Sequence, residues 1–169
     1  VDDEGNLLVL YHGTRAGTQI SVFKTTEEYR KGLYLTDIPK VAEGFASKVV
    51  GRNEDGSFRY ADIKHVTKSN FDDYDFETSG VYKMYANIKN PFIVYAGYAY
   101  YYNIPTPDEM RSGNYGSTVD TQEINAWAYE HGYDGVIVKN VREGGGDYPG
   151  TDVIVFDKNQ VKFADNYEP

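Results

Sequence analysis

Apolar and polar positions alternate along this chain in short runs, and the lengths of these runs predict a fold rich in strands. Residues 6–12, 32–37 and 133–141 are apolar runs bounded by turn residues, a pattern typical of buried strands. Residues 81–95 alternate between polar and apolar side chains around an Asn-Pro pair, which predicts two short strands with a bend between them. Residues 151–165 predict a strand, a turn and a second short strand.

One long helix is predicted, over residues 120–132. Asp120 can cap its first turn, Glu123 three residues on can close a capping box, and Gly132 supplies the stop. Helical spacing brings four side chains to one face, namely Ile124, Trp127, Ala128 and His131.

A shorter helix is predicted over residues 38–50, with Asp37 as its N-cap and Pro39 in its first turn. Its apolar face consists of Val41, Ala42, Phe45, Ala46 and Val49. Some seven short strands accompany these helices, in an order that does not fit a simple βαβ alternation. We therefore predict an α+β fold with a mainly antiparallel core of two sheets.

The chain of 169 residues is long enough for one domain with its own core, and we expect a single domain over residues 1–169. Residues 51–80 are rich in Gly, Asn, Asp and Ser, and predict a mobile loop with at most one short hairpin. Because the chain begins with Val1 and a turn-like stretch, we expect a domain excised from a longer polypeptide. No segment has the apolar length of a membrane span.

Charge and composition narrow the choice of partner. The formal net charge of −9 at pH 7 repels phosphate backbones and disfavours a nucleic-acid partner, although backbone N–H groups and arginines can still hold a small anion. The absence of cysteine excludes disulfides and thiolate chemistry. The three histidines, His12, His65 and His131, lack the spacing of a metal site, so no metal is expected.

Tyrosine occurs 17 times, and five of these residues fall within residues 95–102. A half-exposed sheet edge explains the cluster, because tyrosine buries its ring and keeps its hydroxyl in water. The alternative is a recognition face, in which case adhesion through this surface is the main function.

Three polar residues stand at predicted strand ends and are candidates for chemistry. His12 lies in a Tyr-His-Gly-Thr stretch, Tyr34 lies in Gly-Leu-Tyr-Leu, and Asp152 opens an otherwise apolar strand. An acid at the mouth of a buried strand is costly unless it faces water, a partner or a ligand.

The stretches "YHGTRAG", "KGLYLTDIPKVAEGFA" and "DVIVFDKNQVK" resemble, in this order and spacing, the three sequence blocks of the poly(ADP-ribose) polymerase-like ADP-ribosyltransferases. The stretches "DDEGNLLVLYHGT", "VYKMYANIKNPFIV" and "YDGVIVKNV" resemble in particular the type found in polyvalent proteins of phages, mobile elements and bacterial effectors. The resemblance covers residues 3–165. It implies a split antiparallel β-sandwich with flanking helices and with NAD⁺ bound in the cleft between the two sheets.

By this resemblance His12, Tyr34 and Asp152 match the catalytic His-Tyr-Glu triad, in which the histidine bonds the adenosine ribose and the tyrosine stacks on nicotinamide. Breaking the glycosidic bond of NAD⁺ builds positive charge on the ribose, and a carboxylate bonded to its 2′-hydroxyl stabilises that charge. Asp152 is shorter than the family's glutamate by about 1.5 Å. A shift of that size can cost on the order of a hundredfold in rate.

The resemblance also implies NAD⁺ contacts by Gly13, Thr14, Arg15, Ala42 and Phe45. Gly13 would hold the nicotinamide amide through its backbone, while Ala42 stands where many relatives carry a serine. Phe45 either packs in the core or stacks on the second face of the nicotinamide ring. Arg15 or Lys31 can neutralise the phosphates.

The glycine-rich loop at residues 142–150 occupies the position that touches the modified protein in the family. Arg142, Glu143 and Tyr148 are therefore candidates for acceptor recognition, against the alternative of a plain connector. Glu143 can also act as an acceptor-side acid or as a substitute for the triad acid.

The implied function is that of a mono-ADP-ribosyltransferase, which moves ADP-ribose from NAD⁺ to an acceptor and releases nicotinamide. NAD⁺ is then a substrate, no bound cofactor is needed, and protein is favoured over nucleic acid as the acceptor. The expected setting is the cytoplasm or the cytosol of a target cell. The alternative, motivated by Asp152 in place of glutamate, is an NAD⁺-binding module on the same fold without catalysis.

Overall fold

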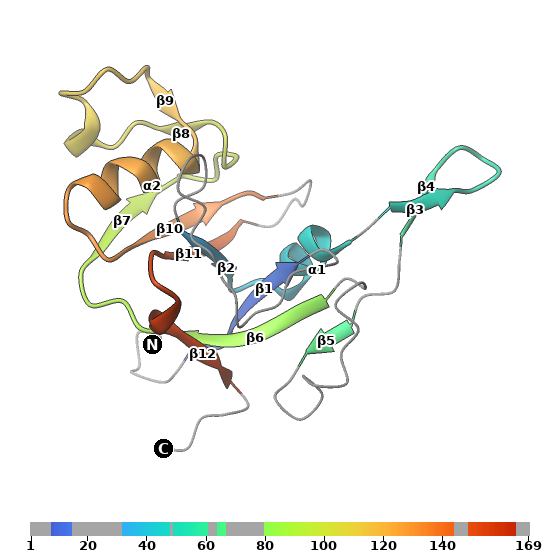
Figure 1. Ribbon diagram of the computed structural model, residues 1–169. Coiled ribbons are helices and arrows are strands. Elements are labelled where there is room, and N and C mark those ends of the chain that lie inside the picture. Colours follow the sequence, from blue (N-terminus) through green and yellow to red (C-terminus); the bar gives the residue numbers. More distant parts are fainter. Residues whose placement is uncertain are drawn as a thin grey trace.

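The computed structural model describes residues 8–14, 32–47, 49–60, 64–66, 80–143 and 149–164, and a single large sheet forms its centre (Figure 1). The strands of this sheet are β1 (Leu10–Thr14), β2 (Leu33–Thr36), β5 (Lys64–Val66), β6 (Gly80–Ala86), β7 (Pro91–Tyr95), β10 (Gly135–Val141), β11 (Gly150–Val155) and β12 (Val161–Phe163). They follow the spatial order β12-β6-β1-β2-β11-β10-β7, and β5 also pairs with β6. The expected α+β fold with a mainly antiparallel sheet is therefore confirmed.

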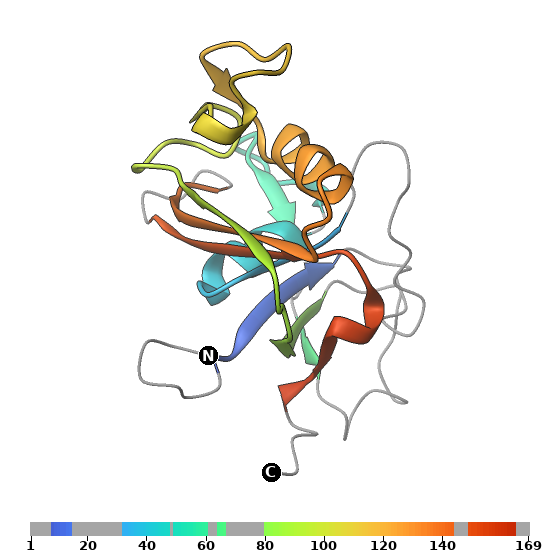
Figure 2. The same cartoon turned by 90° about the vertical axis from the view of Figure 1, so that its left-hand side faces the viewer.

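Two helices and two small hairpins complete the described part of the chain. The helices are α1 (Pro39–Ala46) and α2 (Thr121–Glu130), and the 3₁₀ turns are η3 (Asp108–Met110) and η4 (Lys158–Gln160). The hairpins are β3 (Val49–Arg52) with β4 (Phe58–Tyr60), and β8 (Ile104–Pro105) with β9 (Thr118–Val119). The first hairpin projects away from the sheet (Figure 1), and the second lies beyond α2 (Figure 2). Within the described residues, neither helix is long and apolar enough to cross a membrane.

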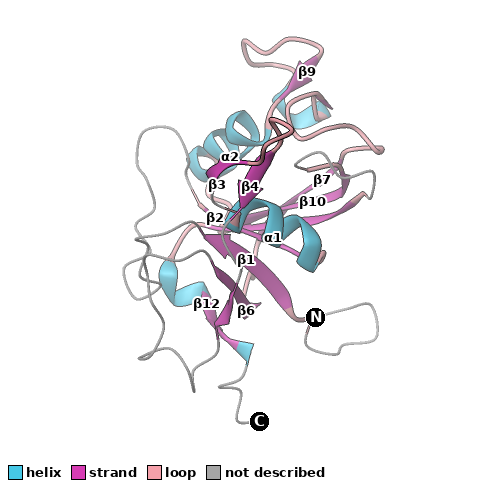
Figure 3. Ribbon diagram, turned by 90° about the vertical axis from the view of Figure 1, so that its right-hand side faces the viewer, coloured by secondary structure: helices cyan, strands magenta, loops and turns pink. Residues whose placement is uncertain are grey.

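Both helices pack on one face of the large sheet. Tyr11 of β1 pairs with Thr36 of β2, which in turn pairs with Asp152 of β11, so these residues share a face. α1 lies against β1 (Figure 3), where Tyr11 packs with the buried residues of the helix, and Ile154, two residues after Asp152, packs with those of α2. A cavity lies on this face between the two helices.

The opposite face of the sheet has a separate core. It consists of Leu10, Leu35, Tyr82, Met84, Val153 and Val155, with residues of β12 packed against it. Because side chains alternate between the faces of a strand, β11 contributes Val153 and Val155 to this core and Ile154 to the other. The central strands are therefore buried on both faces, which explains their continuous apolar runs.

The expected core of two packed sheets differs from the described structure, in which hydrogen bonds join eight strands into one large sheet and the two hairpins stand apart from it. Within the large sheet, β1 and β2 pair at a single position, Tyr11 with Thr36. The element order does not follow a simple βαβ alternation, as expected, although β7 and β10 are parallel neighbours connected through α2.

The predicted caps and ends agree with the structure for α2 but not for α1. α2 begins with the predicted capping box, in which Asp120 accepts from the backbone N–H of Glu123 and Glu123 accepts from that of Asp120. The predicted cap of α1 by Asp37 is wrong. Ile38 is the N-cap, and Asp37 accepts instead from the backbone N–H of Thr151 at 2.8 Å. α1 also ends at Ala46 rather than at residue 50, where the chain has already entered β3.

The segment 51–80, expected to be a loop with one hairpin, holds the β3–β4 hairpin and also β5. We predicted that this segment is mobile, but residues 61–63 and 67–79 lie outside the described residues. Val1, from which we expected an excised domain, also lies outside them.

Candidate active site

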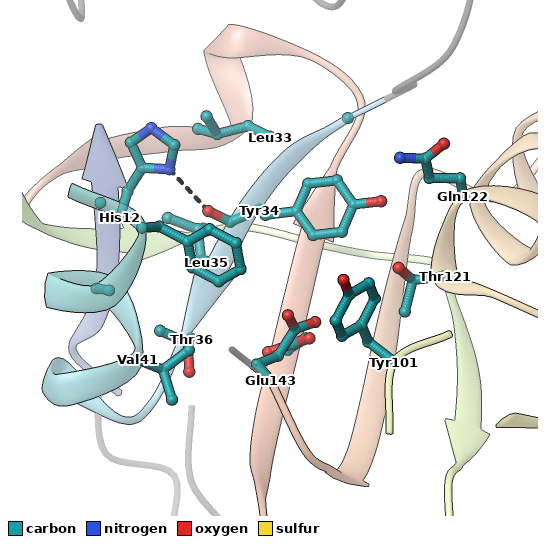
Figure 4. A pocket seen from close by; sticks show the side chains of 15 residues that line it. His12, Leu33, Tyr34, Leu35, Thr36, Val41, Tyr101, Thr121, Gln122 and Glu143 are labelled. Carbon is teal, nitrogen blue, oxygen red and sulfur yellow. Dashed lines mark hydrogen bonds between the residues drawn. The ribbon is translucent and has the colours of Figure 1, made fainter. Parts of the chain in front are cut away.

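A cavity of about 270 Å³ lies on the face of the sheet between α1 and α2. Its walls come from β1 and β2, from α1, from the first turn of α2 and from Tyr101, and its floor carries Glu143 (Figure 4). Asp152 of β11 lines the same cavity. The volume lies just below the roughly 300–1,000 Å³ of typical small-molecule sites. The structure thus brings His12, Tyr34 and Asp152, which are far apart in sequence, to one cavity.

His12 lies at the seam between β1 and β2. Its Nδ1–H donates to the backbone oxygen of Tyr34 at 2.8 Å, a bond that links the two strands where their own pairing stops. Burial lowers the pKa of the imidazole below its ordinary value of 6.5, against the raising effect of this hydrogen bond. Because a carbonyl oxygen can only accept, Nδ1 holds the proton of the neutral ring and Nε2 carries the lone pair.

Tyr34 is held by a residue that the sequence did not single out. Its phenolic oxygen accepts a hydrogen bond of 2.6 Å from Nδ2 of Asn125, which is fully buried in α2. The ring also packs against the core beneath α2. The only sequence signal for Asn125 is a polar side chain next to Ile124 on the inner face of α2, which periodicity alone does not distinguish from a surface position.

Asp152 is the third residue of β11 and is only 4 % exposed. Burial raises the pKa of its carboxyl well above the ordinary 3.8, and the hydrogen bond with Glu143 and the charges of Glu143 and Asp37 raise it further. Its buried Oδ2 receives no hydrogen bond from any described residue. The expectation that this acid opens its strand is wrong, because two residues of β11 precede it. Its side chain faces the cavity.

Glu143 reaches the same cavity because of an irregularity in β10. The pairing of β10 with β11 shifts by one residue between Val138 and Val141, where Asn140 adopts a positive φ of 56°. Such a bulge reverses which side chains face inward. Glu143 consequently lies on the face of Asp152, is only 6 % exposed, and shares a side-chain hydrogen bond with it. Burial raises the pKa of Glu143, while the bond from Asp152 lowers it.

Gly13 and α1 make the closest approach around the cavity. A Cβ on Gly13 would overlap the backbone carbonyl of Ala42, so only glycine allows α1 to sit where it does. Ala42 itself is buried, whereas Phe45 is 50 % exposed, and both line the cavity. The position of Phe45 favours a role at the cavity over core packing. Thr14 is buried at the end of β1 and does not line the cavity.

A family model described as "ADP-Ribosyltransferase in polyvalent proteins" matches residues 2–169 of this sequence. The chain belongs to this ADP-ribosyltransferase family. No match was found among the curated proteins or among the solved structures. The resemblance to the polyvalent-protein type of ADP-ribosyltransferase is confirmed. Residues of the three sequence blocks line the cavity.

Other residues predicted for this ADP-ribosyltransferase domain lie apart from the cavity or outside the described residues. Arg142 extends over the ring of Tyr100, with its Cζ 5.8 Å from the ring centroid, and does not line the cavity. Arg15, Lys31 and Tyr148 fall in segments that are not described. Among the described residues, no group of three His, Asp or Glu side chains is arranged to hold a metal ion.

The tyrosine-rich segment forms an exposed surface beside the cavity of the ADP-ribosyltransferase domain. Tyr95, Tyr98 and Tyr102 are more than half exposed, and the rings of Tyr100 and Tyr102 stack with centroids 5.6 Å apart. Tyr101 differs from the others, because its side chain lines the cavity and points toward Glu143 (Figure 4). The half-exposed surface expected from the sequence is what the structure contains.

Proposed function

We propose that this domain is a mono-ADP-ribosyltransferase, which transfers ADP-ribose from NAD⁺ to a protein acceptor and releases nicotinamide. The observation that carries the proposal is the convergence of His12, Tyr34 and Asp152 on one cavity, in a chain that belongs to an ADP-ribosyltransferase family. The proposal includes the roles of these three residues and a binding mode for NAD⁺.

The aromatic walls of the cavity suit the nicotinamide ring. Tyr34 and Phe45 both line the cavity, and a cationic ring between flat aromatic faces gains from stacking and cation–π attraction. The bond from Asn125 fixes the orientation of the Tyr34 ring before the ligand arrives. Such pre-organisation reduces the entropy lost on binding.

His12 supplies a polar contact at the edge of the cavity. With Nδ1–H bonded to Tyr34, Nε2 is oriented by the seam between the strands and accepts a hydrogen bond from a ribose hydroxyl. A neutral imidazole suits this task, since the lowered pKa keeps the acceptor lone pair present at pH 7.

The acidic floor of the cavity suits the reacting ribose. As the bond to nicotinamide breaks, positive charge develops on the ribose, and negative charge held in a buried site stabilises it more strongly than the same charge in water. Asp152 and Glu143 together provide that charge. The buried Oδ2 of Asp152 is suited to accept a hydrogen bond from the ribose 2′-hydroxyl.

A protein acceptor fits the charge of the molecule better than a nucleic acid. The net charge of −9 repels a polyanion at long range. Two cationic side chains, those of Lys139 and Arg142, lie over the rings of Tyr95 and Tyr100 in the tyrosine-rich segment rather than in an open basic groove.

A second candidate is a non-catalytic NAD⁺-binding module on the same fold. Asp152 favours it, because its side chain is shorter than the glutamate of the resembled triad and its raised pKa favours the neutral acid. A neutral acid at this position stabilises the positive ribose less than a carboxylate does.

Incubation with NAD⁺ labelled in the nicotinamide ring separates the two candidates. We expect the unmodified domain to release nicotinamide, and expect the rate to fall by about a hundredfold or more in His12→Ala and in Asp152→Ala. His65→Ala, which alters an exposed histidine outside the cavity, is the matched control and is expected to match the unmodified domain. Binding of NAD⁺ without release of nicotinamide supports the module, and absence of binding contradicts both candidates.

A further inference from the structure

β7 (Pro91–Tyr95) forms one edge of the large sheet (Figure 1), and among the described residues it pairs with β10 alone. Just beyond this strand, Ala96 donates its backbone N–H to the oxygen of Lys139 in β10. In a strand the N–H and C=O of one residue point to one side, and those of the next residue point to the other. The backbone groups of Ile93 and Tyr95 therefore point away from β10, where no described strand pairs with them.

The side chains along this edge are apolar and exposed. Ile93 and Tyr95 share one face of the strand and are 44 % and 69 % exposed, whereas Phe92 and Val94 pack in the core beneath α2. Proteins usually protect an open edge by a short strand or a charged residue. β12, at the opposite end of the strand order, is three residues long and carries Lys162 at its centre, but β7 has no charged residue. The edge of β7 is therefore unprotected.

We propose that β7 pairs with β7 of a second copy of this chain, antiparallel about a two-fold axis at Ile93. One sheet then continues through both copies. A two-fold axis matches a surface with itself, and Ile93 is the central residue of this five-residue strand. Each Ile93 N–H donates to the Ile93 oxygen of the other copy, and each Tyr95 N–H donates to the oxygen of Pro91. Pro91, at the end of the strand, lacks a donor of its own.

The side-chain pairs that this register creates are complementary. Residues directly opposite one another in an antiparallel pair have Cβ atoms about 4.5–5.5 Å apart. Ile93 lies against Ile93 of the other copy, and each Tyr95 ring lies against the ring of Pro91. Ile137, which pairs with Ile93 in β10 and is only partly buried, extends the apolar surface. Association therefore removes exposed apolar side chains from water.

The net charge of −9 is not concentrated at this edge. Among the residues of β7 and their partners in β10, the only charged side chain is Lys139, whose Nζ lies 5.8 Å from the ring centroid of Tyr95. Asp134 lies at the other end of the strand, where it accepts from the backbone N–H groups of Lys89 and Asn90. Antiparallel pairing brings the Lys139 end of one copy to the Asp134 end of the other. Repulsion between the remaining charges is screened beyond about 8 Å at physiological ionic strength.

Pairing through β7 leaves the cavity of each copy open. The cavity lies on the face of the sheet that carries α1 and α2, and Phe92 and Val94 point to that face. Ile93 and Tyr95 point to the opposite face, because side chains alternate along a strand. The dimer is therefore independent of the proposed function, and each can be tested without the other.

Sedimentation velocity at protein concentrations from about 1 μM to about 1 mM measures the association. We expect the unmodified domain to double its mass across this range. Ile93→Lys and Ile93→Glu are each expected to stay monomeric, because each places two like charges directly opposite one another. An equal mixture of the two variants is expected to dimerise, since lysine then faces glutamate. Phe58→Lys alters a side chain in β4 that is 50 % exposed, and this matched control is expected to dimerise like the unmodified domain.

A cysteine at the same position gives a second measurement, which does not depend on charge. The chain has no cysteine, so Ile93→Cys introduces a single thiol. The Cα atoms of a hydrogen-bonded antiparallel pair lie about 5.5 Å apart, within the range that a disulfide spans. Under the same mild oxidant, we expect Ile93→Cys to form a disulfide-linked dimer at least about tenfold faster than Phe58→Cys, because pairing raises the effective concentration of the two thiols.

Three results contradict this dimer. They are an unmodified domain that stays monomeric up to about 1 mM, a dimer that persists in Ile93→Lys, and a mixture of the two charge variants that stays monomeric. None of them affects the proposed function, because nicotinamide release by Ile93→Lys is expected to equal that of the unmodified domain. If thermal unfolding shows that a charge variant is not folded, the rate of disulfide formation by Ile93→Cys decides.

Discussion

Asp152→Asn is expected to lower the rate of nicotinamide release by about 10²–10³-fold, because an amide, unlike a carboxyl, cannot ionise as positive charge develops on the ribose. The same substitution is expected to raise the free energy of unfolding at pH 8 by about 1 kcal/mol. The asparagine amide can donate to Glu143 without titrating, whereas Asp152 must be held protonated against its ordinary pKa of 3.8. Asp152 is therefore expected to lower the free energy of unfolding and to raise the rate of nicotinamide release.

The pH dependence of stability checks the physical basis of this prediction. A carboxyl whose pKa is raised in the folded state binds more protons there than in the unfolded chain, so stability falls as the pH rises above about 4 and toward the folded pKa. Urea unfolding of the unmodified domain and of Asp152→Asn at pH 5 and pH 8 measures this slope. We expect a smaller loss in the variant. An equal loss in both proteins, or full activity in the variant, contradicts the role given to Asp152.

Gly13→Ala is expected to lower the free energy of unfolding by about 3 kcal/mol, at the upper end of the cost of overpacking. The added Cβ would overlap the carbonyl of Ala42, and a backbone atom in a helix cannot move aside as a flexible side chain can. α1 must then shift away from β1, which also opens the wall of the cavity. Urea unfolding measures the change in stability, and NAD⁺ titration measures the loss of binding that accompanies it.

Gly44→Ala is the matched control for that substitution. Gly44 lies within α1, is exposed, and would place its Cβ in open space. The change is expected to raise stability by about 1 kcal/mol, because alanine favours the helix over glycine. A Gly13→Ala variant as stable as the unmodified domain would mean that α1 does not press on β1 as described.

The sequence predicted the parts of the fold that local patterns determine. α2 was predicted with its capping box and its stop, because Asp120, Glu123 and Gly132 act within one or two turns of helix. The ends of α1 were predicted less well. Aspartate is a residue type favoured at N-caps. The carboxylate of Asp37 instead accepts a hydrogen bond from Thr151, which is 114 positions away and which no local pattern reveals.

The sequence predicted those residues of the site that belong to the matched motifs. Three of the residues that line the cavity were predicted, because each belongs to a conspicuous block of sequence. They are His12, Tyr34 and Asp152. Glu143 was predicted as a residue of the acceptor loop or a substitute acid, but its position beside Asp152 was not, because strict alternation from Val136 and Val138 directs it away from Asp152. The bulge at Asn140 reverses this direction, and a bulge cannot be located from alternation alone.

His12 and the two carboxyls of this cavity make stability depend on pH in opposite directions. The lowered pKa of His12 costs stability as the pH falls below about 6.5, because the unfolded chain then binds the proton more readily. The carboxyl pair costs stability as the pH rises. The two effects oppose one another, so the pH dependence of stability reflects both.

A crystal structure with a non-hydrolysable NAD⁺ analogue tests most directly whether the cavity is the site of ADP-ribose transfer. We predict that the nicotinamide ring lies against Tyr34, with a ribose hydroxyl about 3 Å from Asp152 or Glu143 and the distal ribose at His12. An analogue bound elsewhere on the molecule, or bound here without contact to the two acids, would contradict the central claim.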